Sequence, residues 1–155
     1  MNADLRGFHY ALQPVLERQR WRIDALQARL GAAQRAVNEA QEALDAREQQ
    51  LAAMHQSLAG ARTGRLDPVL LRRSLHWLAG EREQIVAQRQ QLEQLKADRA
   101  ELLAEYRAQQ AKLESLQQHR TERQAEYVQD TQRRAAAAAD SDWLARQGAL
   151  PGSAA

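Results

Sequence analysis

A seven-residue repeat of branched aliphatic side chains constrains the fold of this chain more than any other feature. Every seventh residue from position 16 to position 58 is aliphatic: Leu16, Ile23, Leu30, Val37, Leu44, Leu51 and Leu58. This spacing is typical of a left-handed coiled coil, because it keeps one apolar seam facing a single partner helix. The second seam position of each repeat is less regular, since Gln19 and Arg47 interrupt it.

The repeat stops at a short segment rich in residues that end and begin helices. Gly60 and Gly64 are followed by the pair Asp67-Pro68. Glycine adopts positive φ at low cost, so we expect Gly60 to cap the first helix. Asp67 is expected to be the N-cap of a second helix, with Pro68 as its first residue.

A second heptad repeat follows the Asp-Pro pair and is less pure than the first. Its members are Leu71, Leu78, Ile85, Leu92, Arg99, Tyr106, Leu113, Arg120 and Tyr127. Polar residues occupy several of the alternate seam positions, and we expect Glu81, Gln88 and Gln109 to weaken the seam there. If the chain folds back at the glycines, Leu44 faces Ile85 and Val37 faces Leu92, so large residues meet large residues.

The sequence therefore predicts an all-α fold, a long antiparallel two-helix coiled-coil hairpin. We expect one hairpin over residues 1–147, followed by a disordered tail over residues 148–155. Its parts are helix 1 at about 5–60, the tip at 60–67 and helix 2 at about 68–145. Helix 2 is expected to continue past the start of helix 1 toward Trp143.

Composition and motifs argue against most other functions. The sequence has no cysteine, no phosphate-binding glycine loop and no zinc-protease motif, so we predict a non-enzymatic protein without cofactor, catalytic residue or metal. Two histidine pairs, His9 with His119 and His55 with His76, could face each other, but a metal site would need further ligands. The formal net charge is only +2, and arginines alternate with acidic residues, which disfavours nucleic-acid binding.

Membrane insertion and secretion are also not expected. No apolar run is long enough to span a bilayer, and the first residues lack the apolar core of a secretory signal. We therefore predict a cytoplasmic protein.

Two regions are candidates for contacts with other proteins. Near the tip, Val69, Leu70, Leu71, Leu75, Trp77 and Leu78 lie beside the basic residues Arg62, Arg65, Arg72 and Arg73. Such a patch is typical of a docking surface, although Trp77 could instead fold back and cap the turn. Near the first helix start, Trp21 either faces a partner or lies flat along its own helix.

The stretch Phe8-x-x-x-Leu12-x-x-Val15-Leu16-x-Arg18-x-Arg20 resembles the start of the FliJ/YscO-like stalk proteins of bacterial type III secretion systems. The layout is also similar to theirs: a heptad helix, a short tip, a returning helix with Leu and Tyr in its seam, and a polar tail. The resemblance does not distinguish flagellar export from a virulence injectisome.

The resemblance implies a central stalk at the cytosolic face of the inner membrane. Its paired termini would enter a hexameric export ATPase, and its tip would point to the cytosolic ring of the export gate protein. The implied ATPase-facing residues are Phe8, Leu12, Val15, Arg18, Arg20 and Arg22. The implied gate-facing residues are Leu71, Leu75, Trp77 and Leu78. The free protein would be a monomer. The alternative is a coiled-coil scaffold, or an export chaperone for secreted subunits, which would associate with itself through the Leu71–Leu78 patch.

Overall fold

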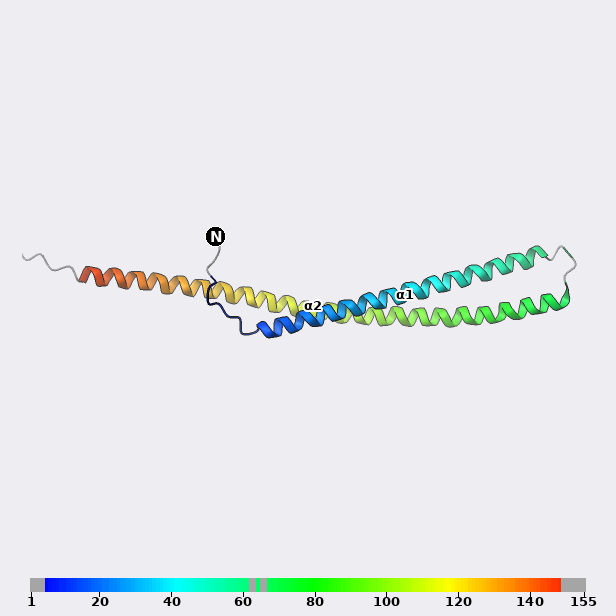
Figure 1. Ribbon diagram of the computed structural model, residues 1–155, viewed down its shortest axis with the longest axis horizontal. Coiled ribbons are helices and arrows are strands. Elements are labelled where there is room, and N and C mark those ends of the chain that lie inside the picture. The colour runs from blue at the N-terminus through cyan, green and yellow to red at the C-terminus, as the bar shows by residue number, and fades with distance from the viewer. Residues whose placement is uncertain (1–4, 62–63, 65–66, 149–155) are drawn as a thin grey trace, which may run out of the picture. The chain divides into compact units, whose positions relative to one another are not determined.

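The computed structural model describes residues 5–61, 64 and 67–148, and their regular structure consists of two helices (Figure 1). Helix α1 spans Gln13–Ala61 and helix α2 spans Pro68–Gly148, with no strand among the described residues. The two helices pack against each other in opposite directions. The predicted fold class, an all-α two-helix hairpin, is confirmed.

The helices form two compact units, and each unit contains a piece of both. One unit combines the chain up to Trp21 with the part from Gln109 onward. The other unit is the continuous segment Arg22–Ala108, which includes the turn. The first unit is called the terminal unit below, and the second is called the turn unit.

The core of the turn unit is the seam that the heptad repeat predicts. Val37, Leu44, Ile85 and Leu92 are buried together, and each is at most 6% exposed. Ala40, Leu51 and Leu95 pack against this cluster and are partly buried. In the terminal unit Leu16 is fully buried. A helix with a single apolar stripe can bury only that stripe, so the remaining faces of both helices stay exposed.

Four of the polar interruptions of the seam form two pairs between the helices, one pair in each unit. In the turn unit Arg47 Nε lies 3.5 Å from Glu81 Oε2. In the terminal unit Gln19 Nε2 donates to the backbone carbonyl of Gln109 at 2.9 Å and to Gln109 Oε1 at 3.0 Å. Gln109 is only 6% exposed, so these bonds satisfy a buried amide. The expected weakening of the seam is therefore reduced at these two places.

Replacing Gln19 alone should destabilise the terminal unit, because Gln19→Leu leaves the buried Gln109 amide without its partner. We expect a loss of about 1–2 kcal/mol in the free energy of unfolding. The double variant Gln19→Leu/Gln109→Leu should recover most of this loss, since neither position then carries a buried polar side chain without a partner. Thermal unfolding followed by circular dichroism measures both variants. A double variant as unstable as the single one would contradict this account.

The start of α2 follows the prediction. The Asp67 Oδ1 atom accepts a hydrogen bond from the Val69 amide at 2.9 Å, and the Asp67 carbonyl accepts from the Leu71 amide at 3.0 Å. Asp67 is therefore an N-cap and Pro68 is the first helical residue, where its missing N–H has no cost.

The end of α1 differs from the prediction. Gly60 lies inside the helix, which continues to Ala61, and it has no positive φ. The expectation that Gly60 caps helix α1 with a positive φ was wrong, because Gly60 keeps a helical backbone and the helix continues to Ala61. Of the predicted tip at 60–67, residues 62, 63, 65 and 66 lie outside the described residues, and Arg62 and Arg65 are among them.

Helix α1 begins at Gln13 and not near residue 5 as predicted. Proline is tolerated only in the first turn of a helix, because it cannot donate to the carbonyl one turn earlier. A helix from residue 5 would place Pro14 in its interior. Starting at Gln13 puts Pro14 in the first turn, and the Leu16 amide then donates to the Leu12 carbonyl at 3.0 Å.

Helix α2 continues to Gly148, slightly further than the predicted end. Every residue from 129 to 147 is exposed, so this part of the helix has no partner helix among the described residues. The tail predicted at 148–155 lies outside the described residues except for Gly148. Within the described part of the chain, neither helix has an apolar stretch long enough to cross a bilayer.

Candidate functional site

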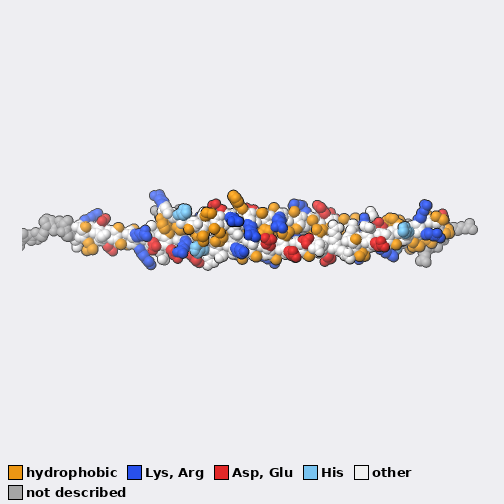
Figure 2. Space-filling model, turned by 90° about the horizontal axis from the view of Figure 1, so that it is seen from below, with side chains coloured by type: hydrophobic (Ala, Val, Ile, Leu, Met, Phe, Trp, Pro, Cys, Tyr) orange, Lys and Arg blue, Asp and Glu red, His pale blue; other side chains and the backbone are white. Residues whose placement is uncertain are grey.

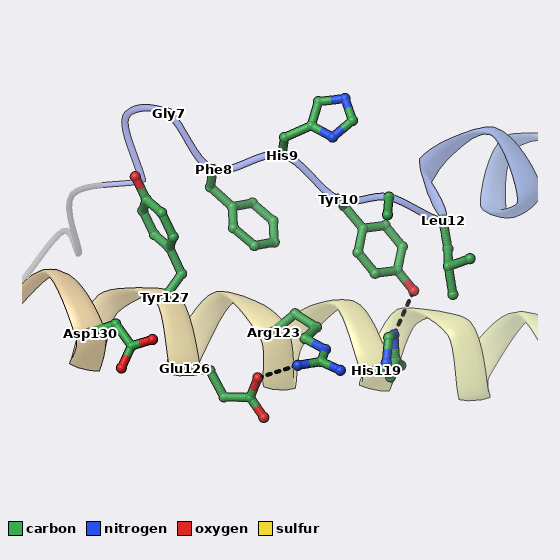
Figure 3. Close-up of a pocket in the computed structure, with 11 residues that line it drawn as sticks. Gly7, Phe8, His9, Tyr10, Leu12, His119, Arg123, Glu126, Tyr127 and Asp130 are labelled. Carbon is green, nitrogen blue, oxygen red and sulfur yellow. Dashed lines mark hydrogen bonds and ion pairs between the residues drawn. The ribbon is translucent and has the colours of Figure 1, made fainter.

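The segment before α1 packs against α2 through four aromatic side chains (Figure 3). These are Phe8, Tyr10, His119 and Tyr127, and we call them the aromatic clasp. The rings of Phe8 and Tyr127 meet edge to face, with centroids 5.6 Å apart. The Tyr10 hydroxyl lies 2.9 Å from His119 Nδ1 and 3.2 Å from the Leu116 carbonyl oxygen. Tyr10 is only 6% exposed, although it lies outside the helices.

Gly7 allows the chain to approach the clasp. Its φ is +84°, a conformation that residues with a Cβ atom rarely adopt. A Cβ atom added at Gly7 would lie 3.1 Å from the Tyr127 hydroxyl oxygen. That hydroxyl donates a 2.7 Å hydrogen bond to the Arg6 carbonyl. Gly7 therefore provides both the backbone turn and the space for the Tyr127 hydroxyl.

Gly7→Ala should loosen the clasp, because the new side chain combines an unfavourable φ with a close contact to Tyr127. We expect the clasped state to lose about 1–2 kcal/mol. Amide hydrogen exchange at Phe8, whose N–H bonds the Leu5 carbonyl at 3.0 Å, should then accelerate about 5- to 30-fold.

The control is Gly80→Ala in the interior of α2, where an added Cβ atom meets nothing within 4 Å. This change should leave exchange at Phe8 unaltered and stabilise the helix by about 0.5–1 kcal/mol. Unchanged exchange at Phe8 in Gly7→Ala would mean that the clasp does not need the positive φ.

An open groove of about 570 Å³ lies beside the clasp. Its polar rim comes from α2, where Arg123 Nη1 forms a 2.7 Å ion pair with Glu126 Oε2. Figure 3 shows Phe8 and Tyr10 directed toward α2 and His9 directed away from it. The groove thus combines apolar rings with charged groups, which suits protein contacts more than small-molecule chemistry.

The two histidine pairs considered from the sequence do not form. His9 is exposed and His119 bonds Tyr10 instead, while the Nε2 atom of His55 lies 3.2 Å from Arg82 Nη2. Within residues 5–61, 64 and 67–148, no group of three or more potential ligands could hold a metal ion.

The predicted ATPase-facing residues are only partly brought together. Phe8 and Leu12 line the clasp groove, where Phe8 is half-buried and Leu12 is 38% exposed. Val15, Arg18 and Arg20 are exposed on the first turns of α1. Arg22 belongs to the turn unit, and its Nη2 atom lies 3.7 Å from Glu105 Oε1.

The unpaired end of α2 adds exposed apolar residues to the terminal unit. Trp143 is 58% exposed and Leu144 is 62% exposed, and the described part of the chain offers nothing that covers them. Trp21 is 77% exposed on α1, which favours the outward orientation over one buried by its own helix.

The predicted gate-facing residues separate into two groups. Leu75 is 54% exposed and Trp77 is 39% exposed, so both are accessible to a partner. Leu78 is 3% exposed in the seam, and Leu71 is half-buried. Leu78 therefore cannot be an accessible contact residue in this conformation, because packing against α1 already uses its side chain.

Charged side chains of both signs are spread over the rest of the surface. Figure 2 shows Lys and Arg interspersed with Asp and Glu along the visible face. Several of these charges form exposed ion pairs, such as Arg89 with Glu48. Such pairs contribute little to stability and are typical of the outer positions of a coiled coil.

The fold and these surfaces define a class of protein, a two-helix hairpin with exposed apolar residues in both units. Comparisons of the chain with known proteins find no matching family model, no matching curated protein and no matching solved structure.

Most of the clasp was not predicted from the sequence. Tyr127 was assigned to the seam, but Tyr10 and the clasped segment were assigned to a helix. Gly7 and Pro14 enclose that segment, and a glycine and a proline seven residues apart are a usable signal for a non-helical stretch.

Proposed function

We propose that this chain is the non-enzymatic central stalk of a bacterial type III secretion apparatus. Its terminal unit would enter the pore of a hexameric export ATPase, and its turn end would contact the cytosolic ring of the export gate protein. This would place it at the cytosolic face of the inner membrane. The observation that carries the proposal is the pairing of α1 with only part of α2, so that one helix continues alone beyond the other.

The terminal unit has the surface that such an insertion needs. Arg18 and Arg20 are exposed on α1, and Trp143 and Leu144 are exposed on α2. Arginine and tryptophan are frequent among the residues that dominate protein interfaces. The Phe8 to Arg20 motif, which resembles the start of the stalk proteins, belongs to the same unit.

A single hairpin in a sixfold pore would act through unequal contacts. It cannot touch six identical subunits in the same way, so its contact energy differs between states of the ring. Only such a difference can shift the equilibrium between ring states or favour ring closure. The stalk would therefore change ATPase turnover without taking part in the chemistry.

The test uses the purified full chain and the type III secretion ATPase of the same organism. We expect the chain to raise ATP turnover, or the fraction of hexamers, by about 2-fold or more at one chain per hexamer. The variant Arg18→Glu/Arg20→Glu should lose this effect, because it reverses two exposed charges of the terminal unit. The matched control Arg72→Glu/Arg73→Glu reverses two exposed charges near the turn and should keep it. No change in turnover or assembly at any ratio would refute the stalk.

A scaffold or export chaperone is the second candidate, and the exposed apolar residues near the turn favour it. Val69 and Leu70 are 60% and 59% exposed, and self-association would cover them. Sedimentation equilibrium separates the two proposals, since the stalk should remain a monomer while the scaffold should form concentration-dependent dimers or tetramers.

A further inference from the structure

Four polar residues interrupt the apolar seam at matching places on the two helices. Gln19 and Arg47 are four heptads apart on α1, and their partners Gln109 and Glu81 are four heptads apart on α2. Gln19 bonds Gln109 within the terminal unit, and Arg47 pairs with Glu81 within the turn unit. A single register of α1 against α2 therefore satisfies both pairs.

The aliphatic residues of the seam do not select this register by themselves. They recur every seven residues on both helices, so a slip of one heptad again places aliphatic side chains opposite each other. Leu44 is buried in one cluster with Ile85, and after such a slip it would face Leu78 or Leu92. The slip moves one helix past the other by about 10 Å, yet it still buries most of the apolar stripe.

The polar residues lose their partners in a slipped register. A slip of one heptad in either direction would place each glutamine opposite a leucine instead of the other glutamine. The leucines are Leu102 or Leu116 for Gln19, and Leu12 or Leu26 for Gln109. Gln109 is only 6% exposed, and a buried amide without a partner disfavours a state by about 5- to 150-fold. Arg47 and Glu81 add less, because their side chains remain 31% and 20% exposed.

One polar group would gain from a slip. The Oε1 atom of Gln88 is buried and has no hydrogen-bond partner among the described residues, and Gln88 lies one heptad beyond Glu81 on α2. A slip in that direction would bring Arg47 opposite Gln88, and Glu81 opposite Met54. Arg47 would then exchange a carboxylate for a neutral amide, while both seam glutamines would lose their bonds. The observed register therefore keeps more polar groups paired.

Other features that favour the observed register are local or exposed. The Asp67 cap fixes the start of α2, but losing an N-cap shifts an equilibrium by only about 5-fold. The bond between Tyr10 and His119 holds the segment before α1 and not α1 itself. Exposed ion pairs such as Arg89 with Glu48 contribute little.

We propose that the Gln19–Gln109 and Arg47–Glu81 pairs fix the register of the hairpin, and we call them the register locks. Polar residues at seam positions can specify the register of a coiled coil at a cost in stability. Here they exclude the registers one heptad away, because only one register pairs all four residues. The register decides how much of α2 continues beyond α1. The locks therefore set the length of the end that the proposed stalk would use, but they do not depend on that function.

The test measures one distance in the purified full chain. The sequence has no cysteine, so Ala32→Cys/Ala79→Cys provides the only two sites for nitroxide spin labels. Both alanines are exposed in the turn unit, and they flank the buried cluster from opposite ends. A slip of one heptad therefore changes their separation by about 10 Å. Double electron–electron resonance should show a single distance in the otherwise unaltered chain.

The decisive variant moves the locks on α1 by one heptad without changing the composition. It exchanges Gln19 with Leu26 and Arg47 with Met54, written Gln19→Leu/Leu26→Gln/Arg47→Met/Met54→Arg. The two lock residues of α2 then find their partners one heptad further along α1. We expect the labels to move apart by about 10 Å. A distance unchanged from that of the unaltered chain would overturn the proposal.

A second variant decides the question if the exchanged chain does not fold. Replacing all four lock residues by leucine leaves no unpaired polar group at these positions, so circular dichroism should show intact helices. Its labels should show at least two distances about 10 Å apart, because no lock then selects one register. A single unaltered distance would overturn the proposal.

Two matched controls keep the seam paired. Arg47→Glu/Glu81→Arg reverses the ion pair, and Tyr10→Phe removes the bond to His119. Both should keep the single distance of the unaltered chain. A second or shifted distance in Tyr10→Phe would assign the register to the clasp and overturn the proposal.

No ATPase takes part in these measurements, so they and the ATPase test fail separately. An unchanged distance in the exchanged chain, with intact ATPase stimulation by the unaltered chain, would refute the locks and keep the stalk. A shifted distance without any ATPase stimulation would refute the stalk and keep the locks.

Discussion

Ile85→Asp should unfold the turn unit, whereas the adjacent Val86→Asp should leave it folded. Ile85 is 4% exposed within the cluster of Val37, Leu44 and Leu92, while Val86 is 52% exposed on the outer face of the same helix. A carboxylate at position 85 has no basic partner in this cluster and would be buried without compensation. Leaving a charge buried and unpaired costs about 3–5 kcal/mol, in addition to the lost apolar contacts.

That loss is large compared with the stability of a fold that has a single seam. Small proteins are stable by only about 5–15 kcal/mol, and two helices bury less than a globular core does. We therefore expect Ile85→Asp to lose most of the helical circular dichroism signal of the turn unit at 25 °C. Val86→Asp should change the free energy of unfolding by less than about 1 kcal/mol. A folded Ile85→Asp chain would show that the helices do not depend on this seam.

Removing the unpaired end of α2 should strongly reduce the proposed effect on the ATPase while leaving the rest of the protein as stable as before. A chain that stops after Gln132 loses the exposed helix with Trp143 and Leu144. These residues are exposed and lie beyond the clasp, so their removal takes away no packing of the described hairpin. We expect the midpoint of thermal unfolding to shift by no more than about 2 °C.

The functional effect should be much larger. If the end of α2 lies in the ATPase pore, its loss should reduce the stimulation of turnover about 5-fold or more, the size of a typical coupling between sites. The full-length control Trp143→Ala/Leu144→Ala keeps the helix and removes only the two large apolar side chains, so it should give an intermediate loss. A truncated chain that stimulates the ATPase as well as the full chain would show that α2 contacts the ring elsewhere.

The heptad spacing determined the residues of the seam, and the glycine-containing segment between the two repeats determined that the helices run in opposite directions. Leu44, Ile85, Val37 and Leu92 meet as the repeat predicts, because a seven-residue period leaves one stripe that two helices can bury together. Asp67 and Pro68 also determined the start of α2, since a cap depends only on neighbouring residues. These are local or periodic properties, and a sequence carries them directly.

The tertiary structure decided what depends on contacts between distant residues. In the sequence Gln19 and Arg47 only interrupt the apolar pattern of the seam. The structure shows that Gln19 hydrogen-bonds Gln109 and that Arg47 pairs with Glu81. The clasp was not visible because Tyr10 and His119 are far apart in the chain and share no repeat. The accessibility of Leu75 and the burial of Leu78 also follow only from packing, because both are leucines on the same few turns and only Leu78 is buried in the seam.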